Sequence, residues 1–231
     1  MKKIARFVGW LAAGALALFL AVQLSFFLRL WWWRDHDPQA TAFMNERLAE
    51  MRKHDPRAKL QYRWVPYARI SGNLKRAIVV AEDSRFVDHE GFDWEAIEKA
   101  REKNEKKGRV VAGGSTISQQ LAKNLFLSPS RTPWRKGQEA LITVMMEHLM
   151  DKRRILEIYL NVIEWGEGVF GAEAAAHHYY GVGAANLGPE AAARLAAIVP
   201  DPRRYDRNRT SGFIARKTQT ILARMPQAEL P

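Results

Sequence analysis

Acidic side chains gather where an apolar helix is predicted to end. The stretch LKRAIVVAEDSRF has apolar residues at helical spacing, and Glu82, Asp83, Arg85 and His89 lie at or just beyond its end. A carboxyl group at the end of such a helix can be half buried, and burial raises its pKa towards the range that suits acid–base catalysis. The same residues also fit a capped, ion-paired helix end without a catalytic role.

Two glycines and two hydroxyl residues precede a second predicted helix, in the segment GGSTISQQLAKNLF. Ser115 and Thr116 form a typical helix N-terminus, where backbone N–H groups suit anions. Amide and ammonium donors follow on part of one face of this helix: Gln119, Gln120, Lys123 and Asn124. The segment suits a phosphorylated sugar, whereas the spacing of a nucleotide-binding phosphate loop is missing.

A third segment, RTPWRKGQE, combines three cations with one carboxylate. Arg131, Arg135 and Lys136 are suited to a diphosphate, since the arginine side chain binds phosphate oxygens in a two-pronged geometry. Taken alone, the segment fits a basic loop facing lipid headgroups equally well.

The three segments together supply two separated carboxylates, Glu82 and Glu139, with a cationic strip between them. Displacement of an anomeric diphosphate with inversion needs a base on the incoming hydroxyl and positive charge on the leaving group. Two carboxylates and a water molecule could instead hydrolyse a glycosidic bond. The cations favour the phosphate leaving group.

The pattern around these segments predicts a mainly α fold with few strands. Residues 94–108 read as a charged helix that ends at Gly108, and the polar residues 101–109 are expected to form a mobile flap. Further helices are predicted within 41–54, 134–165, 171–181, 188–199 and 215–225. We divide the chain of 231 residues into a cytoplasmic tip and anchor (1–34), a juxtamembrane connector (35–66) and a catalytic domain (67–231).

The segment from Phe7 to Leu28 is uncharged and longer than the ~20 residues that a helix needs to cross a bilayer. Lys2, Lys3 and Arg6 precede it, which predicts a cytoplasmic N-terminus. Three tryptophans at 31–33 resemble an interfacial aromatic belt. A cleaved signal peptide is the alternative, although its apolar region is usually only about 7–15 residues long.

The composition limits the classes of partner and the kinds of site that the protein can have. The net charge of +11 favours anionic partners, and the lack of cysteine excludes disulfides and thiolate metal sites. His177 and His178 are adjacent, so they point to different sides of a helix and no metal site is expected there.

The chain resembles the glycosyltransferase family 51, the monofunctional biosynthetic peptidoglycan transglycosylases, whose domain also forms the glycosyltransferase half of class A penicillin-binding proteins. The resemblance runs from about Tyr67 to Tyr205 through EDSRFVDHEGFD, GGSTISQQLAKNLF, RTPWRKGQE, KRRILEIYLN and AAIVPDPRRY. It implies a lysozyme-like helical domain with a small, membrane-apposed jaw subdomain. Val199 and Asp201 depart from the family pattern, which affects only the far side of the cleft.

The resemblance also implies the role of each residue. Glu82 would be the general base and Glu139 the second essential carboxylate, acting as an acid, a metal ligand or an orienting group for the basic residues. Lys123, Arg131 and Arg135 would bind the diphosphate of the donor, and Ser115, Thr116, Gln119, Gln120 and Asn124 would line the cleft. Asp83, Arg85, Phe86 and His89 would hold Glu82 or touch the acceptor, and Glu157, Tyr159 and Asn161 would buttress the site.

The implied reaction is polymerisation of lipid II into β-1,4-linked glycan by one inverting displacement, which releases undecaprenyl diphosphate. The transpeptidase motifs Ser-x-x-Lys and Lys-Thr-Gly are missing from the sequence. We expect no obligatory cofactor, with Mg²⁺ or Mn²⁺ possible, and no nucleic-acid partner. The expected partners are lipid II, the growing lipid-linked strand, the bacterial inner membrane and cell-wall synthesis proteins. The catalytic domain is expected in the periplasm, and the alternative function is that of a murein-cleaving, lysozyme-like enzyme.

Overall fold

The computed structural model describes residues 2–109, 111, 113–128 and 132–231. Helices dominate this part of the chain, which confirms the prediction of a mainly α fold. The α-helices are α1 (Lys2–Trp33), α2 (Ala42–Arg52), α3 (Gly72–Glu82), α4 (Trp94–Lys107), α5 (Ile117–Phe126), α6 (Pro133–Leu149), α7 (Lys152–Val162), α8 (Ala172–Tyr180), α9 (Pro189–Ile198), α10 (Pro202–Arg207) and α11 (Gly212–Arg224). Short 3₁₀ helices span Tyr67–Arg69, Ala184–Asn186 and Met225–Gln227.

Three very short strands form a small sheet in the order β1-β3-β2. The strands are β1 (Gln61–Tyr62), β2 (Glu164–Gly166) and β3 (Val169–Phe170). β1 pairs with β3 in parallel, and β2 pairs with β3 in antiparallel orientation. The sheet therefore connects the segment before α3 to the segment after α7.

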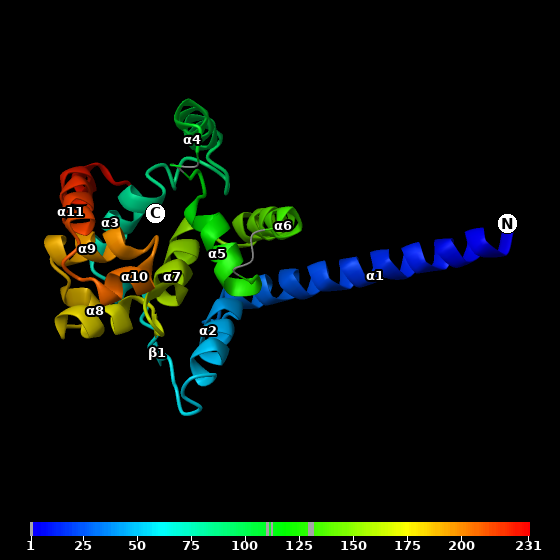
Figure 1. The fold of residues 1–231 in the computed structure, drawn as a ribbon, viewed down its shortest axis with the longest axis horizontal. Helices are drawn as coiled ribbons and strands as arrows, with labels where there is room; N and C mark the ends of the chain where they lie inside the picture. Colours follow the sequence, from blue (N-terminus) through cyan, green and yellow to red (C-terminus); the bar gives the residue numbers. More distant parts are fainter. Residues whose placement is uncertain (1, 110, 112, 129–131) are drawn as a thin grey trace.

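The helices pack around one continuous hydrophobic core (Figure 1). α3 lies against α9 and α11, and α5 lies against α6 and α7. The side chains of Tyr159, Trp165 and Phe170 are fully buried in this core. α3 and α5 carry residues that are predicted to act in the reaction. Each of them is thus held in place by a different set of neighbouring helices.

Residues 35–66 pack closely on the body. α2 lies against α5, and Arg47 on α2 donates to Glu164 at 2.7 Å in a buried ion pair. Tyr62 donates to the carbonyl of Pro38 at 2.7 Å. The domain boundary at residue 66 stays a prediction.

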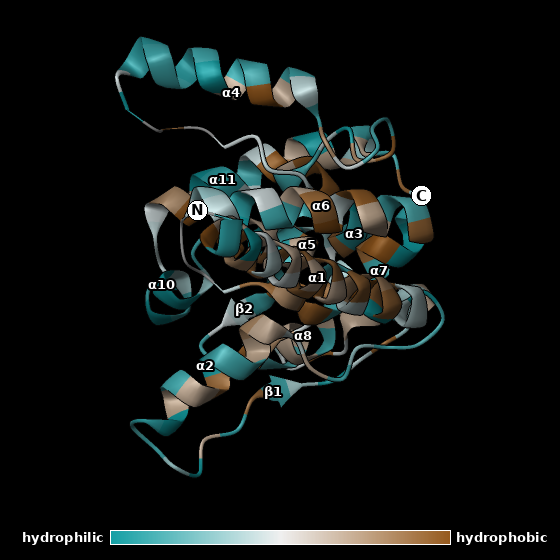
Figure 2. Ribbon diagram, turned by 90° about the vertical axis from the view of Figure 1, so that its right-hand side faces the viewer, coloured by the Kyte–Doolittle hydropathy of each residue, from teal (hydrophilic) through white to brown (hydrophobic). Residues whose placement is uncertain are grey.

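α4 projects from the body and is mostly hydrophilic (Figures 1 and 2). It begins with the side chain of Asp93 accepting from the backbone N–H of Ala96, and it ends at Gly108, whose φ of 61° is left-handed. This end is the one predicted from the sequence.

α1 extends from the body as a long apolar rod (Figures 1 and 2). With 32 residues, it is long and apolar enough to cross a membrane. Its last turns run alongside α6.

Candidate active site

Glu82 is the last residue of α3, and its neighbour Asp83 joins α3 to α5. One carboxylate oxygen of Asp83 accepts from the backbone N–H of Ile117, the first residue of α5, at 3.0 Å. The other oxygen lies 2.9 Å from Nε2 of His89. A buried carboxylate at a helix N-terminus is electrostatically favourable, so Asp83 fixes the end of α3 against the start of α5.

A chain of hydrogen bonds orients the Glu82 carboxylate. The amide nitrogen of Gln120 donates to Oε2 of Glu82 at 2.9 Å. The hydroxyl of Tyr159 in turn donates to Oε1 of Gln120, also at 2.9 Å. Because Tyr159 supplies a proton to the amide oxygen, the amide nitrogen of Gln120 is directed to Glu82.

Burial raises the pKa of Glu82. The hydrogen bond from Gln120 and the positive charges of Lys217 and Lys123 act in the opposite direction, but burial prevails. Burial also lowers the pKa of Lys217, which lies on α11. Sequence reasoning missed Lys217, because it predicted only a helix within 215–225 and no chemistry on it.

Two adjoining grooves connect the predicted segments. A groove of about 160 Å³ is lined by Glu82, Asp83, Gly114, Ser115 and Thr116, among others. A second, more open groove of about 440 Å³ shares Gly114 and Ser115, and it continues to Gln119 and Lys136. The surface beside Glu82 therefore leads along the start of α5 to the start of α6.

Glu139 lies at the far end of this path, in the second turn of α6. Its side chain is buried and accepts from Arg135 at 2.7 Å. Lys136 also donates to it, and this ammonium group is half exposed. Glu139 thus holds two cations, Arg135 and Lys136, and of these Lys136 lines the second groove.

Polar residues at the start of α5 line the grooves, whereas Asn124 further along the helix makes a structural contact. Thr116 and Gln119 form a capping box at the helix N-terminus, and Thr116 also donates to the carbonyl of Gly91 at 2.7 Å. Asn124 donates to the carbonyl of Gln120 at 2.7 Å and is buried. Ser115 is exposed in both grooves.

The residues that follow Asp83 support the segment between α3 and α4. Phe86 is fully buried, with the ammonium of Lys152 4.7 Å from its ring centre. Arg85 pairs with Glu95 on α4. Of the two predicted roles for Phe86, holding Glu82 or touching the acceptor, complete burial fits the first. The predicted diphosphate ligand Arg131 lies outside the described residues.

The predicted buttresses on α7 hold the segment that leads into α3. Asn161 pairs with both backbone groups of Val65, at 3.0 and 2.9 Å. Glu157 accepts from the backbone N–H of Tyr67 at 2.6 Å. These bonds fix the path of the chain just before α3.

One group of three potential metal ligands occurs within the described residues. Asp83, His89 and Asp93 lie within 4.8 Å of one another. Asp83 binds His89 and the start of α5, while Asp93 caps α4. His177 and His178 have different partners, Glu173 and Asp206.

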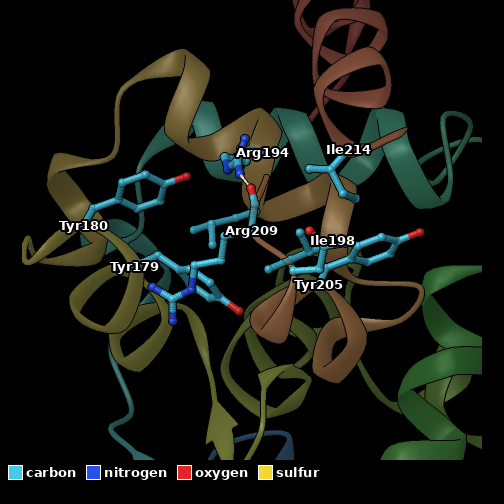
Figure 3. Close-up of a pocket in the computed structure, with 9 residues that line it drawn as sticks. Tyr179, Tyr180, Arg194, Ile198, Tyr205, Arg209 and Ile214 are labelled. Atoms are coloured by element: carbon cyan, nitrogen blue, oxygen red, sulfur yellow. Dashed lines mark hydrogen bonds between the residues drawn. The ribbon is translucent and has the colours of Figure 1, made fainter. Parts of the chain in front are cut away.

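A separate cavity of about 80 Å³ lies between α8, α9, α10 and α11 (Figure 3). Tyr179, Tyr180 and Tyr205 line it, and Arg194 donates to the carbonyl of Arg209 at its edge. None of the predicted site residues lines this cavity. The grooves beside Glu82 are therefore the candidate active site, with the half-buried carboxylate of Glu82 at one end and the ammonium of Lys136 at the other.

Known proteins match the chain over nearly its whole length. The transglycosylase family model matches residues 46–226. The chain is 61% identical over 233 residues to the biosynthetic peptidoglycan transglycosylase of Dechloromonas aromatica (strain RCB), covering 100% of both chains. It is 57% identical over 231 residues to the protein of that name from Janthinobacterium sp. (strain Marseille), again with 100% of both chains covered. The relative of that name from Chromobacterium violaceum is 61% identical over 219 residues, which are 95% of this chain and 96% of the relative.

Proposed function

The chain belongs to the transglycosylase family, and from this premise we propose that it polymerises lipid II into β-1,4-linked glycan strands. It is a peptidoglycan glycosyltransferase. The observation that supports the proposal most directly is the Glu82 carboxylate, which is oriented by Gln120 and has a raised pKa. It opens onto a groove that leads to the cations at Glu139.

Glu82 acts as the general base. It removes the proton from the 4-hydroxyl of the acceptor's N-acetylglucosamine, and that oxygen forms a bond to the anomeric carbon of the donor. The bond from this carbon to the diphosphate oxygen breaks, and undecaprenyl diphosphate leaves with the electron pair. A raised pKa makes the carboxylate a stronger base, which suits proton removal near neutral pH.

Arg135 and Lys136 neutralise the diphosphate as negative charge develops on it, together with Lys123. Among the roles considered for Glu139, the ion pairs with Arg135 and Lys136 favour that of an orienting group. A carboxylate between two cations is a poor acid and a poor metal ligand, because both oxygens already accept charged donors. No step requires a resident metal ion.

The substrate is a membrane lipid, and the surface of the protein is suited to a bilayer. α6 exposes Trp134, Leu141 and Val144 on one side, and α1 runs beside it. We place α1 in the bacterial inner membrane with Lys2 and Lys3 in the cytoplasm, since positive flanks remain on that side. The catalytic domain then lies in the periplasm, where the growing strand and other cell-wall synthesis proteins are accessible.

The proposal is tested by incubating the purified full chain in detergent with lipid II and separating the glycan products by length. Long, uncrosslinked strands are expected, also in the presence of penicillin, and Glu82→Gln should abolish them. Glu90→Gln is the matched control, because Glu90 is an exposed glutamate of the segment between α3 and α4. Normal polymerisation by Glu82→Gln contradicts the assignment of the base. Release of fragments from finished sacculi without activity on lipid II would indicate a murein-cleaving enzyme instead.

A further inference from the structure

One face of α1 is packed against the body of the protein. Phe19, Gln23, Phe26, Leu30 and Trp33 recur at alternating intervals of four and three residues, which keeps them on one side of a helix. Gln23 and Leu30 are buried, and Phe26 and Trp33 pack on the hydrophobic core. The leucines between these positions are more than half exposed. We call these five residues the docked face.

The docked face contacts the two helices that bear the predicted diphosphate ligands. The ring centres of Phe26 and Trp33 lie 4.9 and 5.3 Å from that of Phe126, at the end of α5. The ring of Phe19 lies 6.1 Å from that of Trp134, in the first turn of α6. α1 therefore bridges the end of α5 and the beginning of α6.

Gln23 makes a polar contact within this face. Its amide nitrogen donates to Oε1 of Gln138 on α6 at 2.9 Å, and both side chains are buried. The apolar residues before the docked face, Phe7–Leu18, rise only about 18 Å as a helix, whereas a bilayer core is ~30 Å thick. A bilayer around the whole apolar span thus also surrounds Gln23. There an amide without a hydrogen-bond partner is costly, so the contact with Gln138 is strongly favoured.

This bond reaches α6 directly beside the ion pairs. Gln138 precedes Glu139 and lies three residues after Arg135 on the same helix. Because a helix moves as a unit, a rotation or shift at Gln138 displaces both charged side chains. The C-terminal end of α1 is fixed as well, since Arg154 on α7 donates to the carbonyl of Trp33 at 3.0 Å.

We infer that Gln23 is a positioning residue for glycan polymerisation. Through Gln138, the anchor holds α6 at the depth and rotation at which Arg135 and Lys136 meet the donor diphosphate. The inference rests on the proposed function, and Gln23 itself touches no reacting atom. The apolar helix is accordingly a part of the active-site framework in addition to its role as an attachment.

The first experiment measures polymerisation by the full chain reconstituted in phospholipid vesicles. Gln23→Leu should lower kcat about threefold to tenfold and change the KM for lipid II less, because the groove beside Glu82 is untouched. Combining Gln23→Leu with Gln138→Leu should restore most of kcat, since neither amide is then left unpaired. Ser25→Ala is the matched control, because Ser25 is a polar residue of the same span whose hydroxyl bonds to the carbonyl of Val22 in its own helix.

The second experiment tests the docking without any activity measurement. The natural chain has no cysteine, so Gln23→Cys with Gln138→Cys gives one defined pair for a short bis-maleimide in native membranes. This pair should cross-link within the chain. Ala21→Cys with Gln138→Cys should not, because Ala21 is exposed on another side of α1.

The two experiments separate this inference from the proposed function. Failure of the first pair to cross-link overturns the inference, as does a wild-type kcat for Gln23→Leu. A double variant as slow as Gln23→Leu also overturns it, because the loss would then not come from an unpaired partner. An unmodified chain that is inactive on lipid II contradicts the proposed function, and the cross-link still decides whether α1 is docked.

Discussion

The basicity of Glu82 is set by side chains from three different helices. Gln120 on α5 donates to the carboxylate, Tyr159 on α7 orients that amide, and Lys217 on α11 adds a positive charge. All of these contacts favour the ionised form, while burial disfavours it and raises the pKa. The balance leaves a carboxylate whose pKa is raised above its ordinary value, which makes it a stronger base.

Replacing Lys217 by methionine should shift the pH profile of the enzyme. Activity requires ionised Glu82, so kcat/KM rises with pH through the pKa of this group. Loss of a neighbouring positive charge raises that pKa further, so the rising limb should move to higher pH. Polymerisation rates measured from about pH 5 to about pH 9 check the shift.

Arg216→Met is the control for this experiment, since Arg216 is an exposed cation one position earlier on the same helix. Its rising limb should coincide with that of the unmodified chain. A profile of Lys217→Met that is lower at every pH but unshifted would mean that Lys217 does not act through Glu82.

Removing the Tyr159 hydroxyl should lower activity by releasing Gln120, because Glu82 then loses the donor that orients it. In Tyr159→Phe the amide of Gln120 can rotate and present its oxygen to Glu82, so kcat/KM at neutral pH should fall about fivefold to tenfold. The free energy of unfolding should change by only about 1 kcal/mol, because the ring still fills the core. Tyr62→Phe removes a comparable hydroxyl bond far from Glu82 and should leave the rate unchanged. Equal rates for both variants would contradict the role of Tyr159.

Among single residues, the sequence predicts those that lie in motifs with several polar side chains close together. Glu82, Gln120 and Glu139 stand in segments where several polar side chains follow a helical pattern, and the structure connects these segments through shared grooves. Lys217 could not be found in this way, because its proximity to Glu82 arises from the packing of α11 on α3. A single lysine on an amphipathic helix has no local pattern that indicates a buried partner.

The start of α5 is positioned by a close backbone contact with α4. A Cβ atom on Gly114 would lie 2.8 Å from the Cα of Ile97, which is closer than real side chains approach. Only glycine therefore lets the segment before α5 run against α4. The contact defines the groove between Glu82 and Ser115.

Gly114→Ala should consequently impair polymerisation more than stability. The added methyl group forces α4 or the residues before α5 to move, and a displacement of about 1 Å at a site can cost around 10²-fold in rate. The melting temperature should change little, because α4 projects from the core. Gly113→Ala is a close control, since its Cβ would meet no atom within 4 Å. Similar rates for the two variants would show that the contact with α4 is unimportant.

Helical periodicity and capping residues predict most of the helices, because both are local properties. α4 ends before Gly108 as expected, and α5 starts with the capping pair of Thr116 and Gln119. The strands were not predicted, since β1 and β3 have two residues each and pair across the sequence from Gln61 to Val169. Such short strands have no alternating pattern of their own and form only when the helices bring them together.

The molecule as a whole joins a lipid-facing helix to a catalytic body through packed side chains. Leu30 is completely buried between them, and Arg154 binds the backbone at the end of α1 and beyond it at His36. Hydropathy alone indicates an uncharged apolar span from Phe7 to Leu28. The docked face was not predicted, because in a uniformly apolar helix the side that contacts protein resembles the side that contacts lipid.

Two chimaeras test whether the anchor works only by attachment. In the first, residues 2–18 are replaced by an unrelated apolar helix with the same positive flank, and residues 19–33 are kept. In the second, residues 19–33 are replaced and residues 2–18 are kept. Both should insert into membranes, since both retain a long apolar span.

The first chimaera should polymerise lipid II at the rate of the unmodified chain, because its docked face is intact. The second should be slower by about tenfold and less stable, since it loses the buried side chain of Leu30 and truncation of such a residue costs about 2–5 kcal/mol. Rates in vesicles and melting temperatures in detergent provide the comparison. Equal rates for the two chimaeras would mean that any apolar helix suffices, and that the packing between α1 and α6 has no part in positioning the diphosphate site.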